Sequence, residues 1–168
     1  QDMEILTYVV NGVLTHADSM DNQHILTRGQ VQYMSAGTGI THSEHNRGEE
    51  TLRLLQIWIF PDKKGYTPNY GDYRFNLSDR ENKWLPIACG TDNTHSAAPI
   101  HIHADMNMYA SIISAGNSLE FSVDKGRQAY LVLIEGEADV ESIHLSERDA
   151  LEITEQHIRI VADETAHV

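Results

Sequence analysis

The sequence predicts an all-β protein built from two small antiparallel barrels. Short runs rich in β-branched, aromatic and leucine residues recur along the 168 residues and are separated by Gly, Asn and Asp, which is typical of strands joined by turns. No stretch shows a long, capped helical period. The two halves are also weakly alike: Tyr8–Gly12 matches Leu133–Gly136, and Leu26–Val31 matches Leu145–Ala150. Each half therefore is expected to form one barrel that hides its strand edges.

The first half begins with a predicted hairpin. Residues Glu4–Val10 form a strand-like run that leads into Asn11 and Gly12, a pair that favours a type I′ turn because both positions need positive φ. The return arm of this hairpin is expected at Val13–Asp18. Further strands are expected at residues 24–27, 31–34, 40–45 and 52–60. The last of these is apolar on both faces, which is typical of a strand buried on both sides.

A long connection separates the two halves. Pro61–Trp84 is rich in Pro, Gly, Asn, Asp and Tyr and has no sustained periodicity. We therefore predict an N-terminal domain over residues 1–75 and a C-terminal domain over residues 76–168. Strands of the second domain are expected at 85–89, 100–103, 109–113, 119–123, 129–134, 138–140, 151–153 and 158–162.

Composition excludes several classes of partner. The formal net charge is -13, which opposes binding to a phosphate backbone or an anionic membrane, so no nucleic-acid or membrane partner is expected. No uncharged apolar run is long enough to span a bilayer. Cys89 is the one cysteine of the chain, so it forms no internal disulfide, and a buried, reduced thiol in a cytoplasmic protein is the expectation.

The candidate chemical site is the pair His42 and Glu44. Two residues apart on a predicted strand, their side chains leave the same face with Cα atoms about 6.5 to 7 Å apart. Imidazole plus carboxylate is part of the facial triad that suits non-haem iron and leaves positions open for substrate and dioxygen. A His-x-Glu pair alone is equally compatible with an ordinary hydrogen-bonded or exposed pair.

A long motif around this pair resembles the pirin family, in particular bacterial pirin-like quercetinases. It reads Val-Gln-Tyr-Met-Ser-Ala-Gly-Thr-Gly-Ile-Thr-His-Ser-Glu over residues 31–44. The similarity includes residues 2–9, 16–20 and 56–61, and it continues more weakly to Val161. The resemblance implies a double cupin: two antiparallel jelly-roll barrels, the N-terminal one incomplete in this chain.

The resemblance also implies a metal in the N-terminal barrel, Fe(II) or another divalent transition metal. Family members hold it with three histidines and one glutamate; His42 and Glu44 match the third histidine and the glutamate. The first two histidines belong to a His-Pro-His that the family places immediately before the position of Gln1. We therefore expect an N-terminally truncated chain that binds metal poorly, because two protein ligands define the geometry weakly.

The implied function is a metal-dependent dioxygenase that acts on a small aromatic substrate such as a flavonol, together with dioxygen. By analogy Glu44 is both a metal ligand and a catalytic base. The alternative is a non-catalytic, pirin-like regulatory module that binds protein, and a third reading is a stable remnant without activity. An exposed strand edge left by truncation predicts self-association.

Other candidate ligands are expected to be structural. Glu4 is expected either to support the metal ligands or to be structural, rather than to bind metal, and His16, in a regular strand, is expected to have no function. His101 and His103 form a second His-x-His, but are expected to be exposed edge-strand histidines. The repeat places the counterparts of His42 and Glu44 at Val161 and Asp163, so no metal ligands are expected in the second barrel.

Overall fold

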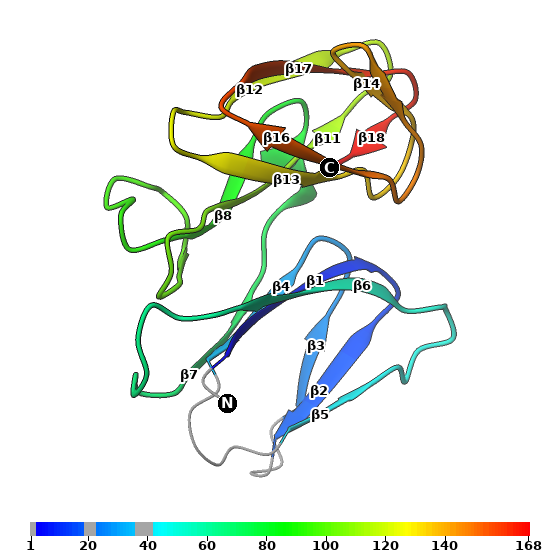
Figure 1. The fold of residues 1–168 in the computed structure, drawn as a ribbon. Coiled ribbons are helices and arrows are strands. Elements are labelled where there is room, and N and C mark those ends of the chain that lie inside the picture. Colours follow the sequence, from blue (N-terminus) through cyan, green and yellow to red (C-terminus); the bar gives the residue numbers. More distant parts are fainter. Residues whose placement is uncertain (1–2, 19–22, 36–41) are drawn as a thin grey trace. The chain divides into compact units, whose positions relative to one another are not determined.

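The computed structural model describes residues 3–18, 23–35 and 42–168, with only the backbone described for Asp18, His42 and Ser43. The chain is almost entirely β-structure, which confirms the predicted class (Figure 1). Within the described ranges the helical structure is a single 3-10 turn, η1 (Leu77–Arg80). None of the described helical segments has the length or apolarity needed to cross a membrane.

The chain folds into two compact units, one of which is discontinuous in sequence. The first comprises Gln1–Asn76 and Pro86–Met108, and the second comprises Leu77–Leu85 and Tyr109–Val168. The sequence predicted one boundary, between residues 75 and 76, whereas in the structure the segment Pro86–Met108 groups with the first unit.

The first unit contains two antiparallel sheets. One has the order β6-β1-β4-β7 and the other the order β3-β2-β5. Their strands are β1 (Glu4–Asn11), β2 (Leu14–Asp18), β3 (Gln23–Leu26), β4 (Val31–Ser35), β5 (His42–His45), β6 (Arg53–Ile59) and β7 (Asn69–Tyr73). A further sheet has β8 (Leu85–Cys89) between β9 (Ile100–His101) and β10 (Met108–Ala110), with β8 and β9 parallel.

The predicted hairpin between β1 and β2 is wrong. β1 pairs with β4 and β6, while β2 pairs with β3 and β5, so the turn at Gly12 carries the chain from one sheet to the other. Gly12 has a φ of 82°, whereas Asn11 is not among the positive-φ residues, so the turn is not of type I′. A Cβ at Gly12 would lie 2.7 Å from the carbonyl oxygen of Thr51, which explains why glycine stands there.

Two other predictions for the first unit fail for the same reason, the position of a strand at a sheet edge. β6 was expected to be buried on both faces, but it is an edge strand, and Trp58 is 57% exposed. β7 was not predicted, because its sequence Asn-Tyr-Gly-Asp-Tyr is polar and contains glycine. It forms the opposite edge of the same sheet, where strand propensity matters less than pairing with β4.

The second unit repeats this organisation with shorter strands. One sheet has the order β12-β17-β14-β15, and two strand pairs, β13-β16 and β11-β18, complete it. Its strands are β11 (Ile112–Ile113), β12 (Ser118–Ser122), β13 (Gln128–Val132), β14 (Ala138–Val140), β15 (Ile143–Leu145), β16 (Ala150–Thr154), β17 (His157–Ala162) and β18 (Ala166–His167). Most were predicted, but β15 and β18 were not.

The internal repeat is visible in matching turns. In Thr27–Gln30 the third residue has a φ of 77° and donates its N–H to the carbonyl of Val9 at 2.8 Å. In Ser146–Asp149 the third residue has a φ of 75° and donates to the carbonyl of Leu133 at 2.6 Å. Val9 and Leu133 each donate back to the last residue of their turn, at 3.0 and 2.9 Å. β1 with β4 therefore corresponds to β13 with β16.

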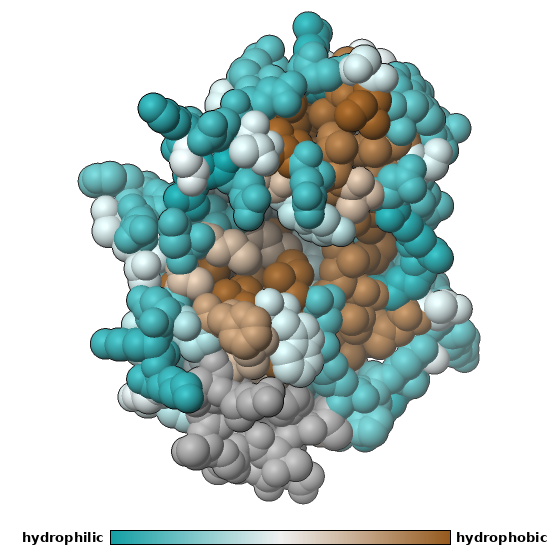
Figure 2. All heavy atoms as spheres, in the orientation of Figure 1, coloured by the Kyte–Doolittle hydropathy of each residue, from teal (hydrophilic) through white to brown (hydrophobic). Residues whose placement is uncertain are grey.

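The molecular surface carries both hydrophilic and apolar side chains. Hydrophilic side chains cover much of the face drawn in Figure 2, and apolar side chains also reach the surface there. The most exposed large apolar side chain among those described is Phe60, immediately after β6, at 80%. Large apolar side chains are exposed in the second unit as well, where Tyr130 is 70% exposed.

Two glycines with positive φ, Gly126 before β13 and Gly136 after it, provide a test of why glycine is needed in a tight turn. A Cβ on Gly136, which has a φ of 94°, would collide with the carbonyl oxygen of Thr165, whereas a Cβ on Gly126, with a φ of 80°, would meet no atom within 4 Å. We expect Gly126→Ala to lower the free energy of unfolding by about 1–2 kcal/mol, the usual cost of the left-handed conformation. Gly136→Ala should cost distinctly more in urea denaturation. Equal costs would contradict a steric role for Thr165.

Candidate functional site

The central strand of the smaller sheet of the first unit brings three polar side chains together. β2 lies between β3 and β5, and His16 is directly opposite Glu44 on one side and His24 on the other. Directly opposed residues of antiparallel strands share a face, so these three lie on the same face. His16 is 2% exposed, which is unusual for a histidine in a regular strand.

The larger sheet presents a row of polar side chains to that face. Thr7 is directly opposite Gln32 on β4 and Gln56 on β6, and both Thr7 and Gln32 are 1% exposed. The Gln32 amide donates to the Tyr70 hydroxyl at 3.2 Å, and the Tyr70 ring stacks on His16 with centroids 5.1 Å apart. The row that contains Thr7 and Gln32 therefore faces β2, in the interior of the unit.

Tyr70 is fixed by a hydrogen-bonded network. Its hydroxyl donates to Asp72 Oδ1 at 2.7 Å, and the other oxygen of Asp72 lies 2.9 Å from His24 Nδ1. The network links β7 of the larger sheet to β3 of the smaller one, and its aromatic member holds the His16 imidazole. A partly buried network with this many partners restricts the positions of its side chains.

The structure places Glu44, but describes only the backbone of His42. Glu44 is half-buried, and the backbone of His42 is paired with Asp18 at the start of β5. The side chain of His42 lies outside the described part of the chain. Imidazole and carboxylate are donor groups that suit a divalent transition metal. The donor types of His42 and Glu44 therefore fit the implied metal.

Glu4 lies on the opposite face of β1 from Thr7, because alternate side chains of a strand point to opposite faces. Its carboxylate is 2% exposed and accepts hydrogen bonds from the Tyr33 hydroxyl and from the His103 backbone N–H, the latter at 3.1 Å. Burial and the bond to Glu4 raise the pKa of Tyr33 above its usual value of 10.0. The structural role expected for Glu4 agrees with these contacts.

The second His-x-His is divided between two environments. His101 is exposed in the edge strand β9, as expected, with its Nδ1 3.6 Å from the buried thiol of Cys89. His103 is neither in a strand nor fully exposed: its ring stacks on Tyr66 with centroids 3.7 Å apart, and its Nδ1 lies 3.1 Å from Glu4 Oε1. The two imidazoles therefore have different partners and different structural roles.

The predicted counterparts of the metal pair in the second unit are wrong. In the first unit His16 on β2 is opposite Glu44, and in the second Val140 on β14 is opposite Ile160. The register thus makes Ile160, not Asp163, the counterpart of Glu44. The error arose because Glu44 follows Gln32 by 12 positions, whereas Ile160 follows Leu151 by 9, so the offset found before this connection does not hold beyond it.

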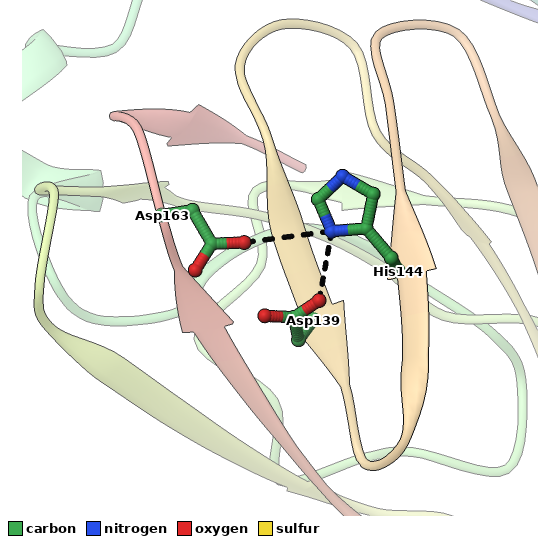
Figure 3. A group of neighbouring side chains, drawn as sticks. All are labelled: Asp139, His144 and Asp163. Atoms are coloured by element: carbon green, nitrogen blue, oxygen red, sulfur yellow. Dashed lines mark hydrogen bonds and ion pairs between the residues drawn. The ribbon is translucent and has the colours of Figure 1, made fainter.

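A different group of polar side chains lies on the surface of the second unit. Asp139, His144 and Asp163 come from β14, β15 and the end of β17, and ligand atoms from all three lie within 4.8 Å of one another (Figure 3). His144 Nδ1 is 2.8 Å from Asp139, and its Nε2 is 2.6 Å from Glu137. The imidazole is thus already held by carboxylates on both ring nitrogens.

Comparison with known proteins identifies the family. The pirin family model matches residues 1–59, and a model described as the quercetinase C-terminal cupin domain matches residues 75–168. The chain belongs to the pirin family. Its fold is accordingly the predicted double cupin.

Several pirin relatives are similar over the whole chain. A putative quercetin 2,3-dioxygenase, PA1210 of Pseudomonas aeruginosa, is 40% identical over 100% of this chain and 72% of its own length. A quercetin 2,3-dioxygenase of Escherichia coli is 35% identical over 100% of this chain and 71% of its own. The bacterial pirin YhhW of Escherichia coli, solved in complex with nickel(II), superposes with a TM-score of 0.85 at 34% identity, covering 99% of this chain and 70% of that one.

Removing the Glu4 carboxylate should destabilise the pirin fold without affecting the interior face toward which Thr7 and Glu44 point. Glu4→Ala leaves the Tyr33 hydroxyl and the His103 N–H without their buried acceptor. We expect the free energy of unfolding to fall by about 1–3 kcal/mol in urea denaturation. Glu49→Ala, at an exposed position, should change it by no more than about 0.5 kcal/mol. A loss of bound metal in refolded Glu4→Ala would contradict the assignment of Glu4 to the other face.

His144 should titrate above its ordinary pKa of 6.5, because Asp139 and Glu137 accept hydrogen bonds from its ring and raise the pKa. A raised pKa in the folded state means that this contribution to stability is complete below the unfolded pKa and is lost as pH rises through the folded pKa. NMR titration of the imidazole measures the pKa directly. Melting temperatures measured below and above this pKa should show the loss of stability in the unsubstituted protein, and this pH dependence should be absent from His144→Gln. A pKa at or below 6.5 would contradict the description of this cluster.

Proposed function

We propose that this pirin is a metal-dependent dioxygenase acting on a flavonol, of the quercetin 2,3-dioxygenase kind. The observation that carries the proposal is the position of Glu44 on the same face as buried His16, opposite a buried row of Thr7 and Gln32. Relatives named as quercetin 2,3-dioxygenases support the choice of a flavonol and dioxygen as reactants.

His42 and Glu44 are the proposed metal ligands, and Fe(II) or another divalent transition metal is the proposed cofactor. The nickel(II) complex of YhhW supports a divalent ion in this family. When bound, such an ion would supply Lewis acidity that lowers the pKa of a coordinated flavonol hydroxyl.

The protein's own groups would complete the chemistry. The Glu44 carboxylate is the proposed acceptor of the flavonol hydroxyl proton. It is the carboxylate that β5 contributes to this face, and it is only half-buried. The fully buried Thr7 and Gln32 would limit water around the substrate and offer it hydrogen-bonding groups.

Alanine substitution of the two proposed ligands tests the function. We expect His42→Ala and Glu44→Ala each to lower quercetin turnover at least about 100-fold and to lose bound metal, measured by oxygen consumption and elemental analysis on the purified protein. Removing the metal from the unsubstituted protein with a chelator should have the same effect. Glu50→Ala, exposed and beyond the end of β5, is the control and should leave both quantities unchanged.

Unchanged oxygen consumption in both variants would overturn the dioxygenase. Stoichiometric metal without any flavonol turnover by the unsubstituted protein would favour the regulatory, protein-binding alternative.

A further inference from the structure

The two units of the chain share the same arrangement of paired strands, here called the frame. The interior side chains at equivalent positions are polar in the first unit and apolar in the second. In the first unit Thr7 on β1 is directly opposite Gln32 on β4. The matching turns make Leu131 and Leu151 their counterparts, and these are directly opposite each other on β13 and β16. Both leucines pack against the apolar core of the second unit. A buried polar pair in one unit is therefore a leucine pair in the other.

The same contrast continues on the opposing sheet. His16 corresponds to Val140, because each lies on the central strand of a three-strand set with matching register. Glu44 corresponds to Ile160 by the same register. Val140 and Ile160 are 1% and 0% exposed and belong to the hydrocarbon core of the second unit.

The second unit thus shows that the same arrangement of strands can fold with apolar side chains at all four equivalent positions. Buried hydroxyl, amide and imidazole groups cost free energy wherever a hydrogen bond is missing, and apolar groups of the same shape in place of both partners are nearly neutral or stabilising. The polar lining of the first unit is therefore not required by the architecture. Its members converge on the face that carries Glu44, which indicates that they serve a ligand bound there.

Within this lining the His16 ring is the most firmly oriented group next to Glu44. It stacks on Tyr70 at an interplanar angle of 21°, and the Tyr70 hydroxyl is bonded both to Gln32 and to Asp72. An aromatic stack that is anchored by two hydrogen bonds leaves the imidazole little freedom to rotate.

We propose that His16 is a substrate-positioning residue of this site: its imidazole, fixed by Tyr70, orients the polar edge of a planar phenolic substrate beside Glu44. This inference rests on the proposed function. It assigns a role to a residue that sequence reasoning expected to have none, and it makes Tyr70 and Gln32 supports that act through His16.

The test replaces His16 with the residue that the second unit uses. His16→Val should fold, with an unchanged or raised melting temperature, and should retain its metal. It should weaken quercetin binding and lower kcat/KM by about 10- to 100-fold, the range expected when a substrate is misplaced. Tyr70→Phe keeps the stacked ring but loses both hydroxyl bonds, and should give a smaller loss. His45→Val is the control, because His45 is exposed on the other face of β5 and should have no effect.

The conservative variant His16→Asn separates positioning from packing, because it keeps a polar group and should recover part of the binding lost in His16→Val. If His16→Val melts much earlier while the folded fraction keeps its kcat/KM and quercetin affinity, His16 is structural and the inference is overturned. If the unsubstituted protein binds quercetin without turning it over, and His16→Val weakens that binding, the dioxygenase fails but the positioning role stands. Absence of quercetin binding by the unsubstituted protein overturns both.

Discussion

The register of β2 between β3 and β5 is the constraint on which the account of the site depends. Pairing fixes which residues of three strands stand side by side, and strand alternation then fixes which of them face the interior. A shift of one residue would turn His16 to the outside and bring Thr15 inward. The register is held by Leu14 and Leu26, which are directly opposite each other and pack with Val9 of the other sheet. Apolar packing at Leu14 thereby fixes where the side chain of His16 lies further along β2.

The two units separate the requirements of folding from those of function. Turns with the same hydrogen bonds and the same positive-φ residue set the frame in both, so the frame does not depend on what lines it. The second unit fills its interior with a continuous apolar cluster, whereas the described apolar cluster beside β2 in the first is centred on Val9, Leu14 and Leu26. The proposed function resides in the lining of one copy, as expected when sites are carried on a reusable scaffold.

Sequence reasoning predicted the class, most strands, the repeat and the family, because these depend on local pattern and on a long motif. It failed where long-range pairing decides the outcome. Asn11 and Gly12 have the composition of a hairpin turn, but the carbonyl of Thr51, which lies far away in the sequence, explains the glycine. The exposure of Trp58 follows from the edge position of β6, which the strand's own sequence does not reveal.

Only part of the candidate site could be predicted from the sequence. His42 and Glu44 were proposed because they lie within a contiguous motif, whereas His16, Tyr70 and Gln32 come together only through the register of two sheets. A signal for them did exist in the sequence: the repeat aligns His16 with Val140 and Gln32 with Leu151. Histidine and glutamine at positions that are apolar in the other copy point to a polar interior.

The most direct test of this account is the location of a bound metal in the crystal. Diffraction data collected at the nickel absorption edge, from crystals of the protein loaded with nickel(II), would reveal the ion by its anomalous signal. The account predicts a peak beside the Glu44 carboxylate in the first unit, on the face shared with His16. A peak only at Asp139, His144 and Asp163 on the surface of the second unit would contradict it.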